Sequence, residues 1–190
     1  MALLLTLRGT PCVYQGEELG LTEAEVPYDR LVDPYGIAFW PEFKGRDGCR
    51  TPIPWSSEAA HAGFSSTDGD PWLPIPDAHR AQAVHAQEGR KESMLHLSRA
   101  LIKSRTNEPA FHSDRIEVLE SDENVLAYLR GSDVATAVLC VFNLSPERSE
   151  YTPPEPWRFA ETLHQGGQVT PATTNGGWSL SPWSLSLIHI

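Results

Sequence analysis

Basic residues are scarce in this chain. Its 190 residues include 15 Lys and Arg against 25 Asp and Glu, which gives a formal net charge of -10. A protein that binds nucleic acid or an anionic membrane surface needs clustered Lys and Arg to neutralise phosphates. The sequence has no such basic stripe, so we expect neither nucleic acid nor a membrane among its partners.

Long apolar runs are also lacking. The first nine residues, MALLLTLRG, are too short to span a membrane. They also lack the charged leading region and the cleavage site of a signal peptide. We therefore expect them to be the end of an amphipathic helix that stops at Arg8 and Gly9, with further chain upstream.

Cysteine is rare. Cys12, Cys49 and Cys140 are odd in number, widely spaced and without a metal-binding pattern, which predicts reduced thiols in a cytoplasmic protein. We expect all three to be small buried apolar residues. The seven histidines share no spacing typical of a metal site or a proton relay, so we predict no metal and no cofactor in this chain.

The stretch from Gly16 to Gly89 is rich in Pro and Gly and has no regular periodicity. A loop of this length inside a compact domain is unusual and is typically functional. Its aromatic side chains make it too apolar to be disordered, and we expect them to anchor it. These aromatic residues are Tyr28, Tyr35, Phe39, Trp40, Phe43, Trp55, Phe64 and Trp72.

Regular patterns flank this loop. Residues 9–15, GTPCVYQ, are typical of a buried parallel strand that follows a helix, a step found in α/β proteins. Beyond the loop, residues 94–102 carry one apolar stripe with helical spacing, and Pro109 ends the predicted helix. The stripe comprises Met94, Leu97, Leu101 and Ile102.

After Ala110 the hydrophobic periodicity changes to two, as in β-strands. An α/β region followed by consecutive strands indicates two domains, the second a small all-β sandwich. Strands are predicted over residues 115–121, 124–131 and 136–145, with at least two more suggested by residues 159–165 and a turn at Gly176–Gly177.

These patterns set the predicted domain boundaries. We place the first domain at residues 1–109 and the sandwich at residues 110–183. The chain closes on an apolar run with nothing polar to solvate it, so we expect residues 184–190 to be a non-native or out-of-frame tail.

Several sequence blocks occur together in the order found in a known family. They are RGTPCVYQGEELG (8–20), DPYGIAFWPEFKGRDGCRTPIPW (33–55), AGFS (62–65), PWLP (71–74) and SMLHLSRALIKSRTNEPAF (93–111). Over roughly residues 1–183 the chain resembles the C-terminal part of an α-glucosidase of the α-amylase superfamily, close to the oligo-1,6-glucosidase group. The GEE and GRDxxRTP blocks are the most specific.

The resemblance implies an α/β fold: the last strand, a long loop and the last helix of a (β/α)₈ TIM barrel, followed by the β-sandwich. It also implies a retaining, exo-acting enzyme that hydrolyses terminal α-linked glucose from small oligosaccharides or glucosides. Such an enzyme needs a nucleophilic carboxylate and an acid/base carboxylate about 5 Å apart. In the family both follow earlier strands, and a third Asp lies in an Asn-His-Asp motif.

This chain contains no Asn-His-Asp motif, so we expect none of the catalytic carboxylates in it and no activity from it alone. Glu17 and Glu18 are adjacent, but neighbouring side chains at a strand end diverge, and the family uses neither as nucleophile or acid. Calcium, which family members often bind, is held through loops of earlier strands and is not expected here.

By resemblance, Arg46 of the GRD block reaches the bottom of the pocket and hydrogen-bonds the hydroxyls of the terminal glucose. A planar guanidinium suits vicinal hydroxyls. The alternative is a salt bridge from Arg46 to Asp47 or another acid that only holds the loop together. For Arg50 we favour a structural role, tying down loop backbone at the RTP turn.

Two glutamates are weaker candidates for support of the pocket. Glu17 is expected to order the end of the eighth barrel strand by accepting loop N–H groups, and Glu23 to pair with Arg46 or Arg30 or to remain a solvated acid. Aromatic residues of the loop could stack on sugar faces, although anchoring of the loop is the simpler interpretation.

Two other functions remain open at this point. A glucosyl-transferring relative, such as a trehalose synthase or a sucrose-acting enzyme, shares the GRDG and RTP motifs. A non-catalytic relative, such as the heavy subunit of an amino-acid transporter, keeps the barrel and loses the carboxylates.

Overall fold

The computed structural model describes residues 1–154, 161–171 and 177–189. These residues form two compact units. One contains Met1 and Cys12–Ala100, and the other contains Ala2–Pro11 and Leu101–Ile190. This division differs from the predicted boundary after residue 109, because the first helix and the second half of the long helix belong with the strands.

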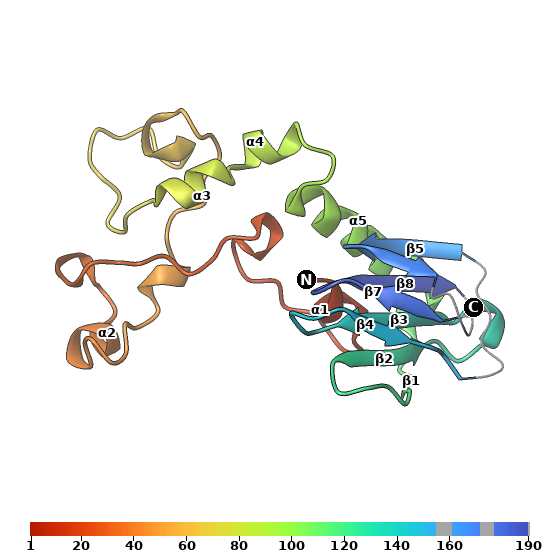
Figure 1. The fold of residues 1–190 in the computed structure, drawn as a ribbon. Helices are drawn as coiled ribbons and strands as arrows, with labels where there is room; N and C mark the ends of the chain where they lie inside the picture. Colours follow the sequence, from red (N-terminus) through yellow and green to blue (C-terminus); the bar gives the residue numbers. More distant parts are fainter. Residues whose placement is uncertain (155–160, 172–176, 190) are drawn as a thin grey trace. The chain divides into compact units, whose positions relative to one another are not determined.

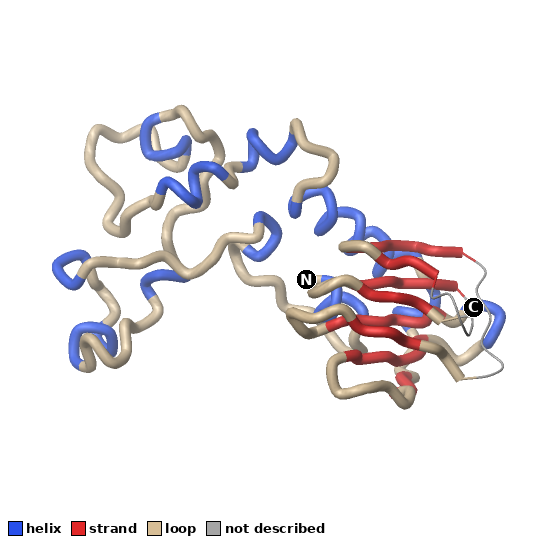
Figure 2. Tube along the Cα trace, viewed as in Figure 1, coloured by secondary structure: helices blue, strands red, loops and turns tan. Residues whose placement is uncertain are grey.

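The first unit consists of short helices joined by irregular backbone, drawn mostly as loop in Figure 2. The abundance of Pro and Gly explains this, since neither residue supports a long helix or a central strand. Its elements are η1 (Glu17–Leu19), η2 (Tyr28–Arg30), α2 (Pro34–Ala38), η3 (Asp47–Cys49), η4 (Ala60–Gly63), α3 (Asp77–Ala81), α4 (Val84–Glu88) and the start of α5 (Met94–Asn107).

The strand predicted over residues 9–15 is not present in the structure. Residues 10–14 are irregular, and a turn at residues 15 and 16 leads into η1. A β-strand exists only through hydrogen bonds to a neighbouring strand. Every strand that the structure describes lies between residues 116 and 189, so this segment has no parallel partner.

The long helix α5 is present where the periodicity predicted it, and Pro109 begins a separate helix, α6 (Pro109–His112). The predicted apolar stripe is only partly right. Leu95, Ser98 and Leu101 are the buried side chains, whereas Ile102 is 45% exposed. The buried face of α5 keeps Leu101 from the predicted stripe but otherwise turns toward Leu95 and Ser98, a rotation that the sequence alone does not reveal.

The aromatic residues of the long loop were predicted to anchor it, and most of them do not. One buried apolar cluster of this unit consists of Val26, Leu31 and Leu73, with Trp40 packed against them. Of the eight predicted anchors, seven are exposed, between 48% for Phe43 and 69% for Trp72. Much of the aromatic surface of this loop is therefore exposed.

The second unit is built around two antiparallel sheets (Figure 1). The larger has the strand order β1-β2-β3-β8-β5 and the smaller the order β4-β7-β6. Buried residues from both sheets form one apolar core. The strands are β1 (Ile116–Val118), β2 (Val125–Arg130), β3 (Val138–Asn143), β4 (Ser149–Tyr151), β5 (Glu161–Gly166), β6 (Val169–Pro171), β7 (Trp178–Leu180) and β8 (Leu185–His189).

The period-two pattern correctly predicted β1, β2 and β3. Each of the three predicted segments contains its strand, and β2 pairs with β3 over six residues. The fourth predicted segment begins outside the described residues but contains most of β5. The predicted turn at Gly176–Gly177 also begins outside them, at Gly176.

The apolar C-terminal run forms β8, between β3 and β5. Leu187 and Ile188 are buried there, with 0% and 3% of their surface exposed. The argument that nothing solvates this run therefore fails, because the run is part of the core. That residues 184–190 are non-native stays a prediction.

Two arginines bind the end of helix α1 (Ala2–Thr6). The last carbonyls of a helix have no partner within it. Arg105 of α5 donates to the carbonyl oxygens of Leu5, Leu7 and Gly9, and the fully buried Arg130 of β2 donates to that of Thr6. The helix end is thereby attached to the larger sheet and to α5.

A half-buried histidine links α5 to β5. The Oγ of Ser104 lies 2.6 Å from Nε2 of His164. Burial lowers the pKa of His164 below its ordinary value, and the nearby carboxylate of Glu108 opposes this only in part. The neutral form of His164 is therefore the one that the folded chain favours.

We expect acid to weaken this link. Above pH of about 6.5 the histidine is neutral in the folded and the unfolded chain. Below it, the unfolded chain binds the proton first because its pKa is the higher, so the free energy of unfolding decreases as pH falls. Thermal unfolding of the full-length protein between neutral and mildly acidic pH should show a smaller decrease for His164→Gln. The exposed His85→Gln serves as the control, and an unchanged slope for His164→Gln would contradict the prediction.

Candidate functional site

The GRD block and helix α2 form one hydrogen-bonded cluster in the first unit. Asp33 is the N-cap of α2: its Oδ1 accepts the backbone N–H of Tyr35 at 3.1 Å, and Pro34 occupies the first helical position. Asp caps a helix well, and Pro loses nothing there because that N–H has no helical partner. The DPYG sequence therefore fixes where this short helix begins.

Arg46 binds the carboxylate of Asp33 through two side-chain nitrogens. Its Nε lies 2.7 Å from Oδ2 and its Nη2 lies 3.1 Å from Oδ1, while its backbone N–H donates to Oδ2 at 2.9 Å. The Asp33 side chain is fully buried. Hydrogen bonds, first of all those from the Arg46 guanidinium, hold the pKa of Asp33 below its usual value despite the burial, so the carboxylate is ionised.

Asp47 makes the reciprocal contact. Its Oδ2 accepts the backbone N–H groups of Val32 at 2.6 Å and Asp33 at 2.8 Å. The start of α2 and the GRD block thus bind each other through the carboxylates of Asp33 and Asp47. These two segments also approach closely at Gly36, since a Cβ on this residue would lie 2.5 Å from the carbonyl oxygen of Lys44.

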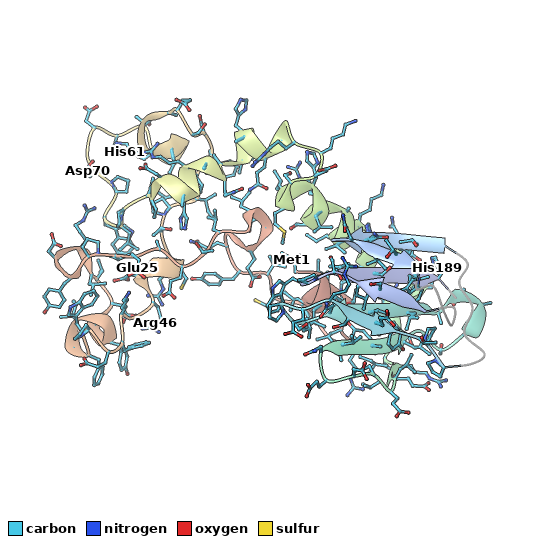
Figure 3. The ribbon with its side chains drawn as sticks, viewed as in Figure 1. Met1, Glu25, Arg46, His61, Asp70 and His189 are labelled. Carbon is cyan, nitrogen blue, oxygen red and sulfur yellow. The ribbon has the colours of Figure 1, made fainter. Side chains whose placement is uncertain are left out.

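The guanidinium of Arg46 nevertheless remains accessible. Its side chain is 54% exposed, and its Cζ lies 5.7 Å from the ring centroid of Tyr35, a cation–π contact on one face. Within the described part of the chain, its Nη1 makes no hydrogen bond. One edge of a fixed planar cation is therefore available to a ligand. Figure 3 labels Arg46 in the first unit.

Arg46 thus forms a salt bridge that holds the loop together, which was the alternative to binding of the sugar. Its acidic partner is Asp33, which the sequence analysis did not single out. The signal that could have found Asp33 is the Asp-Pro step, which is typical of a helix start. The 13-residue separation from Arg46 gave no periodic pattern that would have linked the two.

The two glutamates differ in how far their contacts match the prediction. Glu17 accepts one loop N–H, that of Tyr14, at 3.0 Å, as expected of it, although no strand is present there. Glu23 pairs with neither predicted partner, because Arg46 binds Asp33 and Arg30 donates to the carbonyl oxygens of residues 71 and 72. Glu17 and Glu23 both line a hollow of about 190 Å³.

Arg50 shows no contact that would tie down the loop. Its side chain is exposed and makes no hydrogen bond or ion pair among the described residues. Only its backbone participates, where its N–H donates to the carbonyl oxygen of Asp47 at 3.0 Å and closes η3. The structure therefore gives the predicted structural role of the Arg50 side chain no support.

The cysteines differ from the prediction at two of three positions. Cys12 and Cys49 are exposed, and only Cys140 is buried, where burial raises the pKa of its thiol to about 12. In the ranges that the structure describes, no group of three or more His, Cys, Asp or Glu residues is arranged to hold a metal ion. No described helix is long and apolar enough to cross a lipid bilayer.

Comparison with known proteins agrees with the sequence blocks. The family model of the alpha amylase catalytic domain matches residues 1–114. A probable alpha-glucosidase of Rhizobium meliloti (strain 1021) is 47% identical over 169 residues, covering 89% of this chain and 30% of the relative. The chain thus spans about a third or less of the length of the enzymes that it matches.

Two solved structures are similar over nearly the whole chain. The alpha-glucosyl transfer enzyme XgtA has a TM-score of 0.83 and 42% sequence identity, covering 98% of this chain and 34% of its own. The trehalulose synthase MutB of Pseudomonas mesoacidophila MX-45 has a TM-score of 0.84 and 28% identity, covering 98% and 36%. A variant of MutB was solved with its substrate sucrose.

The match of the catalytic-domain model to residues 1–114 and the identity to an alpha-glucosidase agree with the motifs around Glu17 and Arg46. The chain therefore belongs to the alpha-amylase family and corresponds to a segment of its alpha-glucosidase members.

Proposed function

We propose that this chain is the C-terminal segment of a retaining, exo-acting α-glucosidase that cleaves terminal α-linked glucose from small oligosaccharides or glucosides. In this proposal residues 1–109 complete a TIM barrel whose earlier strands carry the catalytic carboxylates, and a β-sandwich follows. Family membership and the exposed aromatic surface of the first unit support it. A cytoplasmic location remains part of the same proposal.

The observation that carries the proposal is the geometry of Arg46. A guanidinium held by a buried carboxylate on one edge and open on the other can donate to sugar hydroxyls without moving. Within the proposal it binds the terminal glucose at the closed end of the pocket and thereby selects exo-action.

Glucosyl transfer is the second candidate, because XgtA and MutB are similar over 98% of the chain. Hydrolysis and transfer share the same glucosyl pocket and differ in the acceptor that attacks the intermediate. Product analysis of the full-length enzyme on maltose and sucrose distinguishes them. Free glucose as the main product supports hydrolysis, and new glucosides or a sucrose isomer would favour transfer.

The segment alone is expected to be inactive, since the proposed nucleophile and acid lie outside it. We expect no release of p-nitrophenol from p-nitrophenyl α-glucoside by the purified 190-residue chain. The full-length enzyme, assayed in parallel, is the positive control. Turnover by the segment would overturn the placement of the catalytic carboxylates upstream.

A further inference from the structure

We infer that Asp33 is the positioning residue for Arg46 and that, by balancing its charge, Asp33 makes this subsite select uncharged glucosyl units over anionic ones. The inference rests on the proposed function, in which Arg46 contacts the terminal glucose. It assigns a role to a residue that the sequence marks as a helix cap and as the first residue of the block 33–55.

Positioning follows from the contacts of the guanidinium. An exposed arginine samples many rotamers, and holding it still costs conformational entropy when the ligand binds. Here Nε and Nη2 are already fixed by Asp33, and the ring of Tyr35 covers one face. Asp33 is in turn fixed by the backbone N–H groups of Tyr35 and Arg46. The open edge of Arg46 therefore points in one direction before a ligand arrives.

Charge selection follows from the same geometry. A free arginine attracts phosphate and carboxylate groups through two parallel hydrogen bonds. In this structure the edge suited to such an anion is occupied by the buried carboxylate of Asp33, and Asp47 acts on Arg46 electrostatically as well. An anionic sugar would meet two carboxylates beside one guanidinium, whereas a neutral hydroxyl needs only a donor.

The test compares Asp33→Asn with a matched control in the full-length enzyme. The amide oxygen of Asn can still cap α2, so the variant removes the charge and keeps the cap. Glu88→Gln is the control, because Glu88 binds Arg99 through both carboxylate oxygens, at 3.0 and 2.7 Å, on an exposed surface. Glucose and glucose 6-phosphate are the two probes, each measured as a competitive inhibitor.

We expect Asp33→Asn to lower kcat/KM for p-nitrophenyl α-glucoside by about tenfold or more. We also expect the ratio of the inhibition constants of glucose and glucose 6-phosphate to change by about tenfold in favour of glucose 6-phosphate. Glu88→Gln should change neither quantity by more than about twofold. A structural defect alone would weaken the binding of both inhibitors together and leave the ratio unchanged. The ratio therefore separates charge selection by Asp33 from a merely structural role. If Asp33→Asn unfolds at assay temperature, Asp33→Ser keeps a cap and repeats the test.

Each outcome decides a separate point. An unchanged ratio, or an Asp33→Asn variant that behaves as Glu88→Gln does, overturns the inference. If Arg46→Ala itself leaves turnover unchanged, the proposed function fails instead. Loss of turnover in Arg46→Ala together with a shifted ratio in Asp33→Asn supports both.

Discussion

Replacement of Arg46 by alanine in the full-length enzyme is expected to lower kcat/KM for α-glucosides by about 100-fold or more. A pocket built to hydrogen-bond a substrate hydroxyl loses far more than one contact when the donor is removed. In this case the ionised Asp33 also loses the two side-chain hydrogen bonds that balance its buried charge. Steady-state kinetics with p-nitrophenyl α-glucoside and maltose measure the effect.

The matched control is Arg99→Ala. Arg99 is 53% exposed and Arg46 is 54% exposed, and each binds one carboxylate through two nitrogens. Only Arg46 lies in the GRD block and opposes a fully buried acid. A loss below about threefold for Arg46→Ala, or an equal loss for Arg99→Ala, would reduce Arg46 to a structural role and remove the main support for the proposed function.

The division of the loss between kcat and KM carries further information. If Arg46 binds the glucose more strongly in the transition state than in the ground state, kcat decreases together with kcat/KM. If it binds both equally, only KM rises. The fixed orientation of the guanidinium by Asp33 favours the first result, because a preorganised donor needs no rearrangement as charge develops on the sugar.

Local periodicity explains which parts of the fold could be predicted. The helix over residues 94–107 and the strands β1 to β3 each carry their own repeat of apolar residues, so the sequence sufficed. The strand predicted at residues 9–15 has the same kind of local signal and still does not form. Parallel strands depend on neighbours that are distant in the chain, and the described residues supply none.

Long-range polar contacts explain what sequence could not predict. The motif identifies Arg46 but not its partner Asp33, and Arg130 stands at the end of a strand that is otherwise apolar and almost entirely buried. The carbonyls that Arg130 binds come from α1, from α6 and from the segment between α6 and β1, at least 15 residues away in sequence. No local pattern of residue types predicts that these carbonyl groups lie around one arginine.

The arrangement around Arg130 predicts the largest stability effect. Arg130 is fully buried, and burial lowers the pKa of its guanidinium. It donates to the carbonyl oxygens of Phe111 at 3.3 Å, Ser113 at 2.6 Å and Arg115 at 3.2 Å, and also to that of Thr6. Arg130→Met keeps much of the volume but leaves these acceptors without a donor. We expect it to lower the free energy of unfolding by about 3 kcal/mol or more.

Denaturant unfolding, followed by tryptophan fluorescence, measures this loss. Arg148→Met is the control, because Arg148 is exposed and the hydrogen bond that its side chain makes among the described residues, to Ser179 Oγ at 3.1 Å, lies at the surface. This variant should change stability by about 0.5 kcal/mol or less. The loss of stability in Arg130→Lys should lie between the losses in these two variants. The lysine ammonium keeps the charge but can donate to fewer of the carbonyl groups than the planar guanidinium can. If Arg130→Met were as stable as the control, water would have to replace all of these hydrogen bonds, and α1 would not depend on this arginine for its attachment to the sheet.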